Sequence, residues 1–168
     1  METIVLAPGH TIEISLPCTL RYLNVGTELV QAILSRLPEP PDERTLAGVQ
    51  LAVQEVCANI VENAADESSR FDLVVGLDEQ ADRLVIETYD DGASFNPQQV
   101  AVPTVGVEQV GGYGLFLIKM AMDAVGYFAR GGLAWESIAN DDWREIPHQP
   151  ALRNHWRLVK NLTPGSES

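Results

Sequence analysis

Residues 71–89, with the sequence FDLVVGLDEQADRLVIETY, carry the pattern that decides the fold. Two short runs rich in valine, leucine and isoleucine lie at 71–77 and 83–89, and the polar segment DEQAD separates them. Apolar runs of this kind, joined by a short polar turn, are typical of neighbouring strands. We therefore predict an antiparallel pair of strands in the middle of the chain.

A long helix is predicted directly before this pair, from about Asp42 to Ala65. Asp42 can cap the helix, and Glu43 lies in the first turn, where a negative charge is favoured. Four apolar side chains recur at helical spacing, so one face of the helix packs on a large surface. They are Val49, Val53, Val56 and Ile60.

The elements predicted farther out complete the fold. Alternating apolar residues indicate a first strand, Pro38 ends a first helix, and Gly114 opens a third helix. This order predicts an α+β fold, a two-layer α/β sandwich with helices on one face of a mixed, mostly antiparallel sheet. The remaining elements are a strand at 11–17, a helix at 20–37, a loop at 98–113, a helix from 114 to about 126 and a last strand at 155–162.

Length and charge narrow the class of protein. The 168 residues fit one domain at 1–162, followed by a frayed tail at 163–168. The net charge of −13 argues against direct binding to nucleic acid, because phosphates require a basic face. The sequence has no apolar run long enough for a membrane span and begins without a signal-peptide pattern, so we expect a cytoplasmic protein without a membrane partner. Two cysteines, Cys18 and Cys57, give no reason to expect a disulfide.

Glu55 and Asn59 form the first of three candidate site segments. They lie four residues apart in the predicted helix, so they share a face that is offset from the apolar stripe. A carboxamide oxygen suits Mg²⁺, and a carboxylate can act as a general base towards a hydroxyl group. The alternative is an ordinary solvated flank of the helix.

Asp90 and Gly92 form the second segment, directly after the second strand of the central pair. An aspartate there can accept a hydrogen bond from an exocyclic amine such as that of adenine. Glycine would allow the base to approach the backbone closely. The alternative is a tight turn that binds nothing.

Gly111, Gly112 and Gly114 form the third segment, where the third helix begins. Glycines that open a helix present free amide N–H groups at the positive end of its dipole, which is a good anion site. The signal is weak by itself, and it is not a Walker A motif because no Lys-Ser or Lys-Thr pair follows.

In this order the three segments resemble the N, G1 and G2 boxes of the ATPase superfamily that includes gyrase, histidine kinases and mismatch-repair ATPases. The matching stretches are LAVQEVCANIVENA (51–64), YDDGASFNP (89–97) and GGYGLFLIKMAMDAVGY (111–127). The third is particularly similar to the stand-alone anti-sigma-factor serine/threonine kinases. The resemblance runs from the first to the last predicted strand, and it implies the Bergerat-type, histidine-kinase-like ATP-binding fold.

The resemblance implies ATP and Mg²⁺ as cofactors and gives the matched residues their roles. Asn59 would bind Mg²⁺ and so hold the triphosphate, Glu55 would be the catalytic general base, and Asp90 would recognise the adenine amino group. Residues 98–111 would form a lid. The implied nucleotide-binding set is completed by Asn63, Gly92, Gly112 and Gly114.

The resemblance also implies partners. Members of the family bind a sigma factor, phosphorylate an anti-anti-sigma (STAS-like) protein on serine, and typically form homodimers. The implied function is an anti-sigma regulatory factor with ATP-dependent serine/threonine kinase activity. One alternative is a non-catalytic module that sequesters a partner protein. Another is the ATPase part of a histidine kinase, which the lack of an upstream helical hairpin with a phosphorylatable histidine disfavours.

Three positions depart from the family pattern. Asn63 stands where a histidine often follows the Mg²⁺-binding asparagine. Ser94 replaces the second glycine of the Asp-x-Gly-x-Gly motif, and Asn96 replaces a common aspartate. None of these changes removes the matched Glu, Asn or Asp.

Residues 129–154 are longer than the turn that the family usually has between its last strands. The segment contains Trp135 and Trp143. Two interpretations stay open at this point. The segment is either an insertion whose exposed tryptophans contact a partner, or an extended hairpin whose tryptophans cover the sheet.

Overall fold

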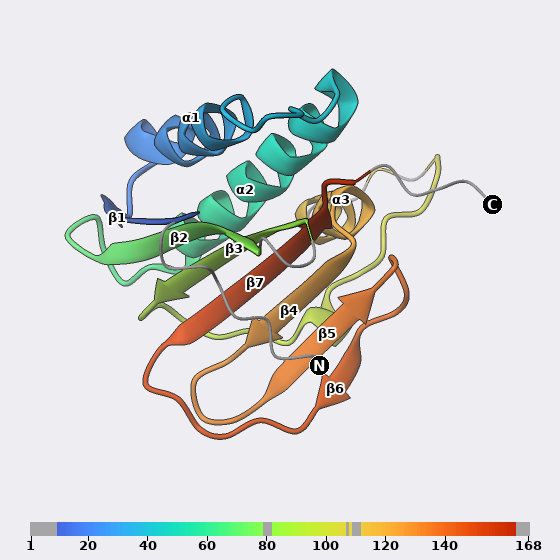
Figure 1. Ribbon diagram of the computed structural model, residues 1–168. Coiled ribbons are helices and arrows are strands. Elements are labelled where there is room, and N and C mark those ends of the chain that lie inside the picture. The colour runs from blue at the N-terminus through green and yellow to red at the C-terminus, as the bar shows by residue number, and fades with distance from the viewer. Residues whose placement is uncertain (1–9, 79–81, 107, 109–111, 164–168) are drawn as a thin grey trace.

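The computed structural model describes residues 10–78, 82–106, 108 and 112–163. In this part of the chain seven strands form one sheet in the order β1-β2-β3-β7-β4-β5-β6, and each neighbouring pair is antiparallel (Figure 1). The strands are β1 (Thr11–Pro17), β2 (Arg70–Asp78), β3 (Arg83–Asp90), β4 (Ala124–Phe128), β5 (Ala134–Ile138), β6 (Arg144–Ile146) and β7 (Asn154–Asn161).

The α-helices of the described residues lie on one face of this sheet (Figure 1). The predicted cap is confirmed, because the Asp42 carboxylate accepts a hydrogen bond of 2.7 Å from the Thr45 amide. Helices on one face of the sheet confirm the predicted two-layer α+β fold. The sheet differs from the predicted mixed one, because all of its strand pairs within the described residues are antiparallel. The helices are α1 (Leu23–Leu34), α2 (Glu43–Asn63) and α3 (Tyr113–Ala121), with short 3₁₀ turns at η2 (Leu20–Tyr22) and η3 (Pro97–Gln99).

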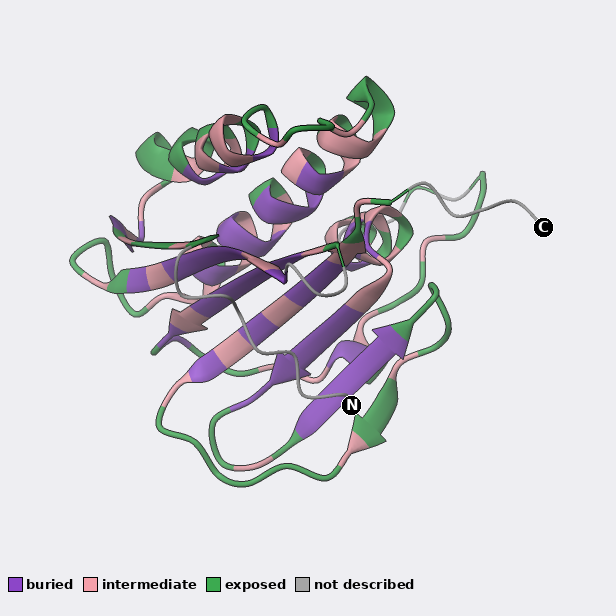
Figure 2. Ribbon diagram, in the orientation of Figure 1, coloured by how far each residue is buried: buried purple, intermediate pink, exposed green. Residues whose placement is uncertain are grey.

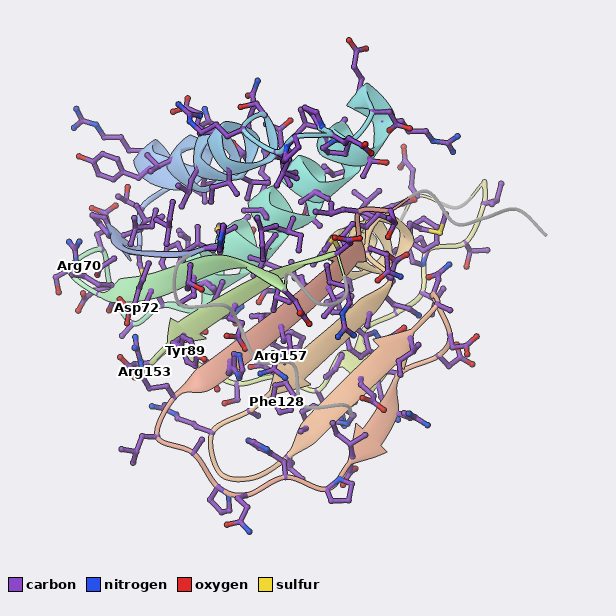
Figure 3. The ribbon with its side chains drawn as sticks, viewed as in Figure 1. Arg70, Asp72, Tyr89, Phe128, Arg153 and Arg157 are labelled. Atoms are coloured by element: carbon purple, nitrogen blue, oxygen red, sulfur yellow. The ribbon has the colours of Figure 1, made fainter. Side chains whose placement is uncertain are left out.

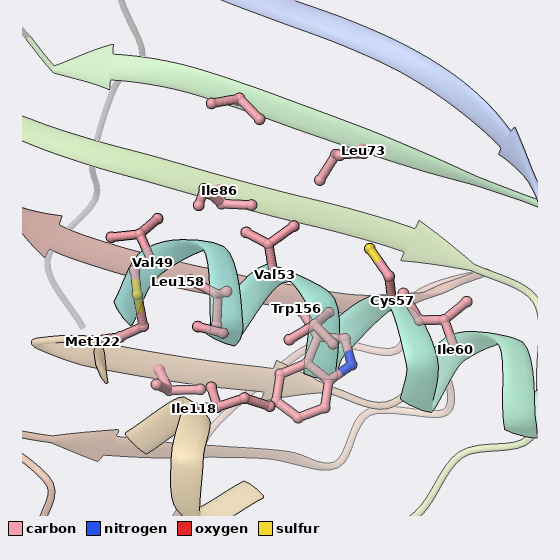
Figure 4. Close-up of a cluster of buried hydrophobic side chains, with 14 of the residues drawn as sticks. Val49, Val53, Cys57, Ile60, Leu73, Ile86, Ile118, Met122, Trp156 and Leu158 are labelled. Carbon is pink, nitrogen blue, oxygen red and sulfur yellow. The ribbon is translucent and has the colours of Figure 1, made fainter. Parts of the chain in front are cut away.

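The hydrophobic core lies between α2 and the sheet (Figure 4). All four side chains of the predicted stripe on α2 are buried, and so is Cys57. Sheet side chains such as Ile86 and Leu158 belong to the same cluster. Figure 2 shows the buried residues following the central strands and the inner side of α2. This packing fixes the rotation of α2 and so sets where its remaining side chains point.

The predicted third helix is too long. It ends at Ala121 rather than near Gly126, and residues 124–128 form β4. Met122 has an extended backbone with φ −109° and ψ 152°. Val125 and Tyr127 then enter the core on alternate positions, and β4 pairs with both β5 and β7. Strand pairing on both edges outweighs the local helical pattern.

Residues 129–154 widen the sheet by β5 and β6. Trp135 is 2% exposed and stacks on Tyr127, with 6.2 Å between ring centroids. Trp143 is half-buried and packs against the core. The expectation of exposed tryptophans is therefore wrong, and the interpretation of an extended hairpin whose tryptophans cover the sheet fits both rings. The large apolar surface of the tryptophan rings explains this outcome, because removing that surface from water stabilises the folded state.

Candidate functional site

Helix α2 joins the two ends of the candidate site. Near its middle, the Glu55 carboxylate lies against the first turn of α3, where a β-carbon placed on Gly114 would be only 2.8 Å from Glu55 Oε2. At its last residue, the carbonyl oxygen of Asn63 accepts a hydrogen bond of 2.9 Å from the Ala93 amide. The first, second and third sequence segments therefore meet along a single helix.

Glu55 and Asn59 are both half-buried on α2. Within the described residues, the Glu55 carboxylate forms no ion pair and no side-chain hydrogen bond reaches the Asn59 amide. Both groups are thus available to a ligand or a substrate hydroxyl. Asn63, one turn further, differs because its amide donates a hydrogen bond of 2.8 Å to the Asn59 carbonyl. The second hydrogen of this amide makes no hydrogen bond to the described residues, so the nucleotide contact of Asn63 stays a prediction.

A metal ion at this site would find few protein ligands. The described residues contain no group of three or more His, Cys, Asp or Glu side chains that could hold a metal ion. Mg²⁺ is commonly bound by one or two protein oxygens together with substrate phosphates. Asn59 fits that pattern, since its amide is half-buried and has no side-chain partner among the described residues.

The turn after β3 explains why glycine occupies position 92. A β-carbon there would lie 2.6 Å from the Asn63 carbonyl oxygen, so α2 and the turn touch backbone to backbone. The Gly92 amide donates a hydrogen bond of 2.9 Å to Asp90 Oδ1. The reason for glycine is thus the close approach of α2, an origin that the sequence did not indicate.

Asn154 is a site residue that the sequence reasoning missed. It is fully buried at the start of β7, and its Nδ2 donates to Asp90 Oδ1 at 3.1 Å and to the Gly92 carbonyl at 3.0 Å. Its Oδ1 accepts from the Ser94 hydroxyl at 2.6 Å and from the Arg130 amide at 3.1 Å. Asn154 therefore ties β7 to the Asp90 turn. The only signal in the sequence was the departure from glycine at Ser94.

Asp90 is 5% exposed and its ionisation is perturbed. Burial raises the pKa of its carboxyl group above the ordinary value of 3.8, and the hydrogen bonds from Asn154 and Gly92 oppose this effect only in part. Both hydrogen bonds to this carboxylate go to Oδ1, so Oδ2 has no such bond within the described residues. A carboxylate oxygen without such a bond can accept a hydrogen bond from a ligand that donates one.

The start of α3 provides the third part of the site. Gly112 caps the helix in the left-handed region, with φ 86° and ψ −22°, which glycine adopts without strain. Gly114 follows in the first turn, beside Glu55. Gly111, which the sequence analysis also placed here, lies outside the described residues. Free amides at this helix start suit an anion.

The predicted lid is in contact with the β5–β6 connection. A pocket of ≈ 240 Å³ separates η3 and the chain after it from α3, and Trp143 lines it together with Phe116 and Lys119. Gln98 Nε2 donates a hydrogen bond of 3.0 Å to the Trp143 carbonyl, and the Lys119 ammonium group lies 6.0 Å from the centroid of the Trp143 ring. Trp143 therefore packs within the chain, on the described part of the predicted lid.

The sheet face opposite the helices carries a separate polar cluster (Figure 3). Glu87 accepts hydrogen bonds from Arg157 at 2.8 Å and contacts His155 at 3.1 Å. Burial acts to raise the pKa of Glu87, but these two partners hold it below its ordinary value. His155 also stacks on Tyr89, with 4.5 Å between centroids. These side chains pair with one another and lie on the sheet face away from α2, apart from the three site segments.

The comparisons with known proteins identify the family. A sequence profile described as the histidine kinase-like ATPase domain matches residues 16–134. The chain belongs to this family. The match covers β2, β3, α2 and α3, which together carry all three site segments.

Several curated relatives are named serine-protein kinase RsbW. The chain is 33% identical to the one from Halalkalibacterium halodurans over 125 residues, which is 69% of this chain and 74% of the relative. It is 25% identical to the one from Bacillus subtilis over 152 residues, which is 86% of this chain and 94% of the relative. The resemblance to anti-sigma-factor serine kinases is thus confirmed.

A solved structure supports the fold. The structure of the RsbU and RsbW domains of Rv1364c from Mycobacterium tuberculosis matches with a TM-score of 0.54 at 13% identity. The match covers 92% of this chain and 33% of that chain, so this protein spans about a third of the length of the solved chain.

No helix among the described residues is long and apolar enough to cross a membrane.

Proposed function

We propose that this protein is an ATP-dependent serine/threonine protein kinase that acts as an anti-sigma factor. In this proposal it binds a sigma factor and phosphorylates a serine of an anti-anti-sigma protein. The family and the curated relatives named serine-protein kinase support the kinase class. The expected compartment is the cytoplasm, where a sigma factor and its regulators meet.

The observation that carries the proposal is the place of Glu55. Its carboxylate, which forms no ion pair within the described residues, lies at the first turn of α3, 2.8 Å from the β-carbon position of Gly114. The free amides of this turn suit the phosphates of a nucleotide. A base within reach of the terminal phosphate is what transfer to a hydroxyl group requires.

Each group in the site would then have one task. The Asp90 carboxylate accepts a hydrogen bond from the adenine amine, and the amides at Gly112 and Gly114 hold the phosphates. Asn59 would hold Mg²⁺, which when bound neutralises charge on the phosphate oxygens. Glu55 accepts the proton of the attacking serine hydroxyl while the terminal phosphoryl group moves to that oxygen, its bond to the bridging oxygen breaks, and ADP leaves. Residues 98–106 and 108 belong to the lid that excludes water.

Calorimetric titration with ATP, with and without Mg²⁺, tests nucleotide binding. We expect Mg²⁺-dependent binding by the wild-type protein and loss of the Mg²⁺ effect in Asn59→Ala. Gln54→Ala, an exposed neighbour of Glu55 on α2, is the matched control and should bind as the wild type does. A folded wild-type protein that binds no ATP would identify a non-catalytic protein-sequestering module instead.

Transfer to a partner tests the kinase step. With a serine-bearing anti-anti-sigma protein and labelled ATP, Glu55→Gln should bind ATP normally but transfer phosphate about 10²-fold or more slowly, which is the usual contribution of a general base. Wild-type transfer rates in this variant would remove Glu55 from the chemistry.

A further inference from the structure

Asn154 and Asp90 face each other across two neighbouring strands. They are register partners at the ends of β7 and β3. Asn154 is 0% exposed, so every polar atom of its side chain needs a protein partner. Such a partner set restricts how the amide can be oriented.

The orientation of the Asn154 amide follows from its backbone partners. The Arg130 N–H group, 3.1 Å away, can only donate, and the Gly92 carbonyl, 3.0 Å away, can only accept. Oδ1 must therefore face Arg130, and Nδ2 must face Gly92. The second hydrogen of Nδ2 is then directed to Asp90 Oδ1 at 3.1 Å.

Ser94 holds this amide in place. Its hydroxyl group donates a short hydrogen bond of 2.6 Å to Asn154 Oδ1. The family pattern has glycine at this position, and glycine has no side chain to make the bond. The departure at Ser94 thus acquires a structural reason, since serine and asparagine form a pair behind the Asp90 turn.

As a consequence, the two carboxylate oxygens of Asp90 differ in their hydrogen bonds. Oδ1 accepts from the Gly92 amide and from Asn154, while Oδ2 has no hydrogen bond within the described residues. Adenine presents an amino donor where guanine presents a carbonyl acceptor. An acceptor fixed at Oδ2 attracts the first base and repels the second.

We propose that Asn154, held by Ser94, is a positioning residue that orients Asp90 so that Oδ2 selects adenine over guanine. The inference rests on the proposed function, because it assumes that a nucleotide base lies at Asp90. It adds a determinant of base selectivity from β7, outside the three sequence segments.

The test measures ATP and GTP affinities by calorimetry with Mg²⁺ between pH 5 and 8. The variants are Asn154→Asp and Ser94→Ala. Asn161→Asp, at the exposed far end of β7, adds the same charge away from the site and serves as the control. Urea unfolding of each variant reports separately on the fold.

Asn154→Asp replaces a donor by an acceptor that faces Asp90 and the Gly92 carbonyl. We expect ATP affinity at pH 8 to fall about tenfold or more, and the ratio of ATP to GTP affinity to fall with it. Acidification should restore ATP binding, because a proton on the introduced carboxyl group again donates to Asp90. The wild-type protein should show no such restoration, because Asn154 donates to Asp90 at every pH. A purely structural role would not produce this restoration of ATP binding by acid.

Ser94→Ala keeps the Asn154 amide and loosens it. We expect a smaller fall in the ratio of ATP to GTP affinity, with the pH profile of the wild type. Wild-type ratios in a folded Asn154→Asp variant would overturn the inference. Should Asn154→Asp fail to fold, an unchanged ratio in Ser94→Ala would overturn it. Absence of ATP binding by the wild-type protein would overturn the proposed function itself. That result comes from the wild-type protein alone, so it is distinct from a failure of the inference about Asn154.

Discussion

The Glu55 carboxylate occupies the space that a side chain at Gly114 would need, since Oε2 lies 2.8 Å from the β-carbon position. Helix α2 and the first turn of α3 are thus in contact at this point, where the Glu55 carboxylate lies over a glycine that has no side chain. The atom in the way is the end of a flexible side chain, so it can move without displacing the backbone. A methyl group added at position 114 can therefore change function without lowering stability.

Gly114→Ala should leave the protein as stable as the wild type or up to about 1 kcal/mol more stable, because alanine favours a helix over glycine. Phosphate transfer should nevertheless fall about 10²-fold, because the methyl group displaces Glu55. Urea unfolding and a phosphate-transfer assay measure the two effects. Gly48→Ala, whose β-carbon would meet Ala121 at an ordinary 3.6 Å, is the matched control and should gain stability without losing activity. Equal activity in both variants would contradict the contact.

Gly92→Ala should behave in the opposite way. Its β-carbon would lie 2.6 Å from the Asn63 carbonyl oxygen, and a backbone atom at the end of α2 cannot move away cheaply. We expect a loss of about 1–3 kcal/mol in the free energy of unfolding, as for other overpacked sites. Urea denaturation measures this loss. An unfolding midpoint equal to that of the wild type would show that the last turn of α2 can move away at little cost.

Asp90→Asn tests the raised pKa of the buried carboxyl group. Because the folded state holds this proton more tightly than the unfolded state does, Asp90 lowers stability as the pH rises from 3.8 through its raised pKa. The variant should lack this fall, so the stability difference, variant minus wild type, grows over that window and is constant above it. Unfolding curves at a series of pH values measure the difference. A difference independent of pH would mean that Asp90 titrates normally.

The same substitution separates stability from binding. The asparagine oxygen can still accept from Gly92 and Asn154, so the fold is kept. Its amino group would then face the adenine amine, donor against donor. We expect ATP affinity to fall about tenfold or more, measured by calorimetry.

Trp135→Ala tests the role of the region between β4 and β7. The ring is 2% exposed and stacks on Tyr127, so its removal should cost about 3–5 kcal/mol in the free energy of unfolding. Trp143→Ala, with a half-buried ring, should cost clearly less and should loosen the segment around Gln98. Thermal and urea unfolding distinguish the two variants. Small and equal losses in the free energy of unfolding would mean that neither tryptophan ring is packed in the core.

Local signals in the sequence were sufficient for most of the elements. The Asp42 cap and the apolar stripe gave α2 within a few residues, because capping and helical periodicity act between near neighbours. The central pair of strands followed from two apolar runs and a polar turn. The end of α3 was missed, because β4 is stabilised by pairing with β5 and β7, which the local sequence does not contain.

The sequence by itself determined the chemistry available to the site, namely a carboxylate and a carboxamide on one helix, an aspartate after a strand and glycines before a helix. Spacing within each segment was enough for this, because side chains a turn apart share a face. The tertiary structure alone decided that Asn63 touches Gly92 and that Asn154 fixes Asp90. Residues 90 and 154 meet only through the register of β3 against β7, and register is set by the packing of the whole sheet on its core.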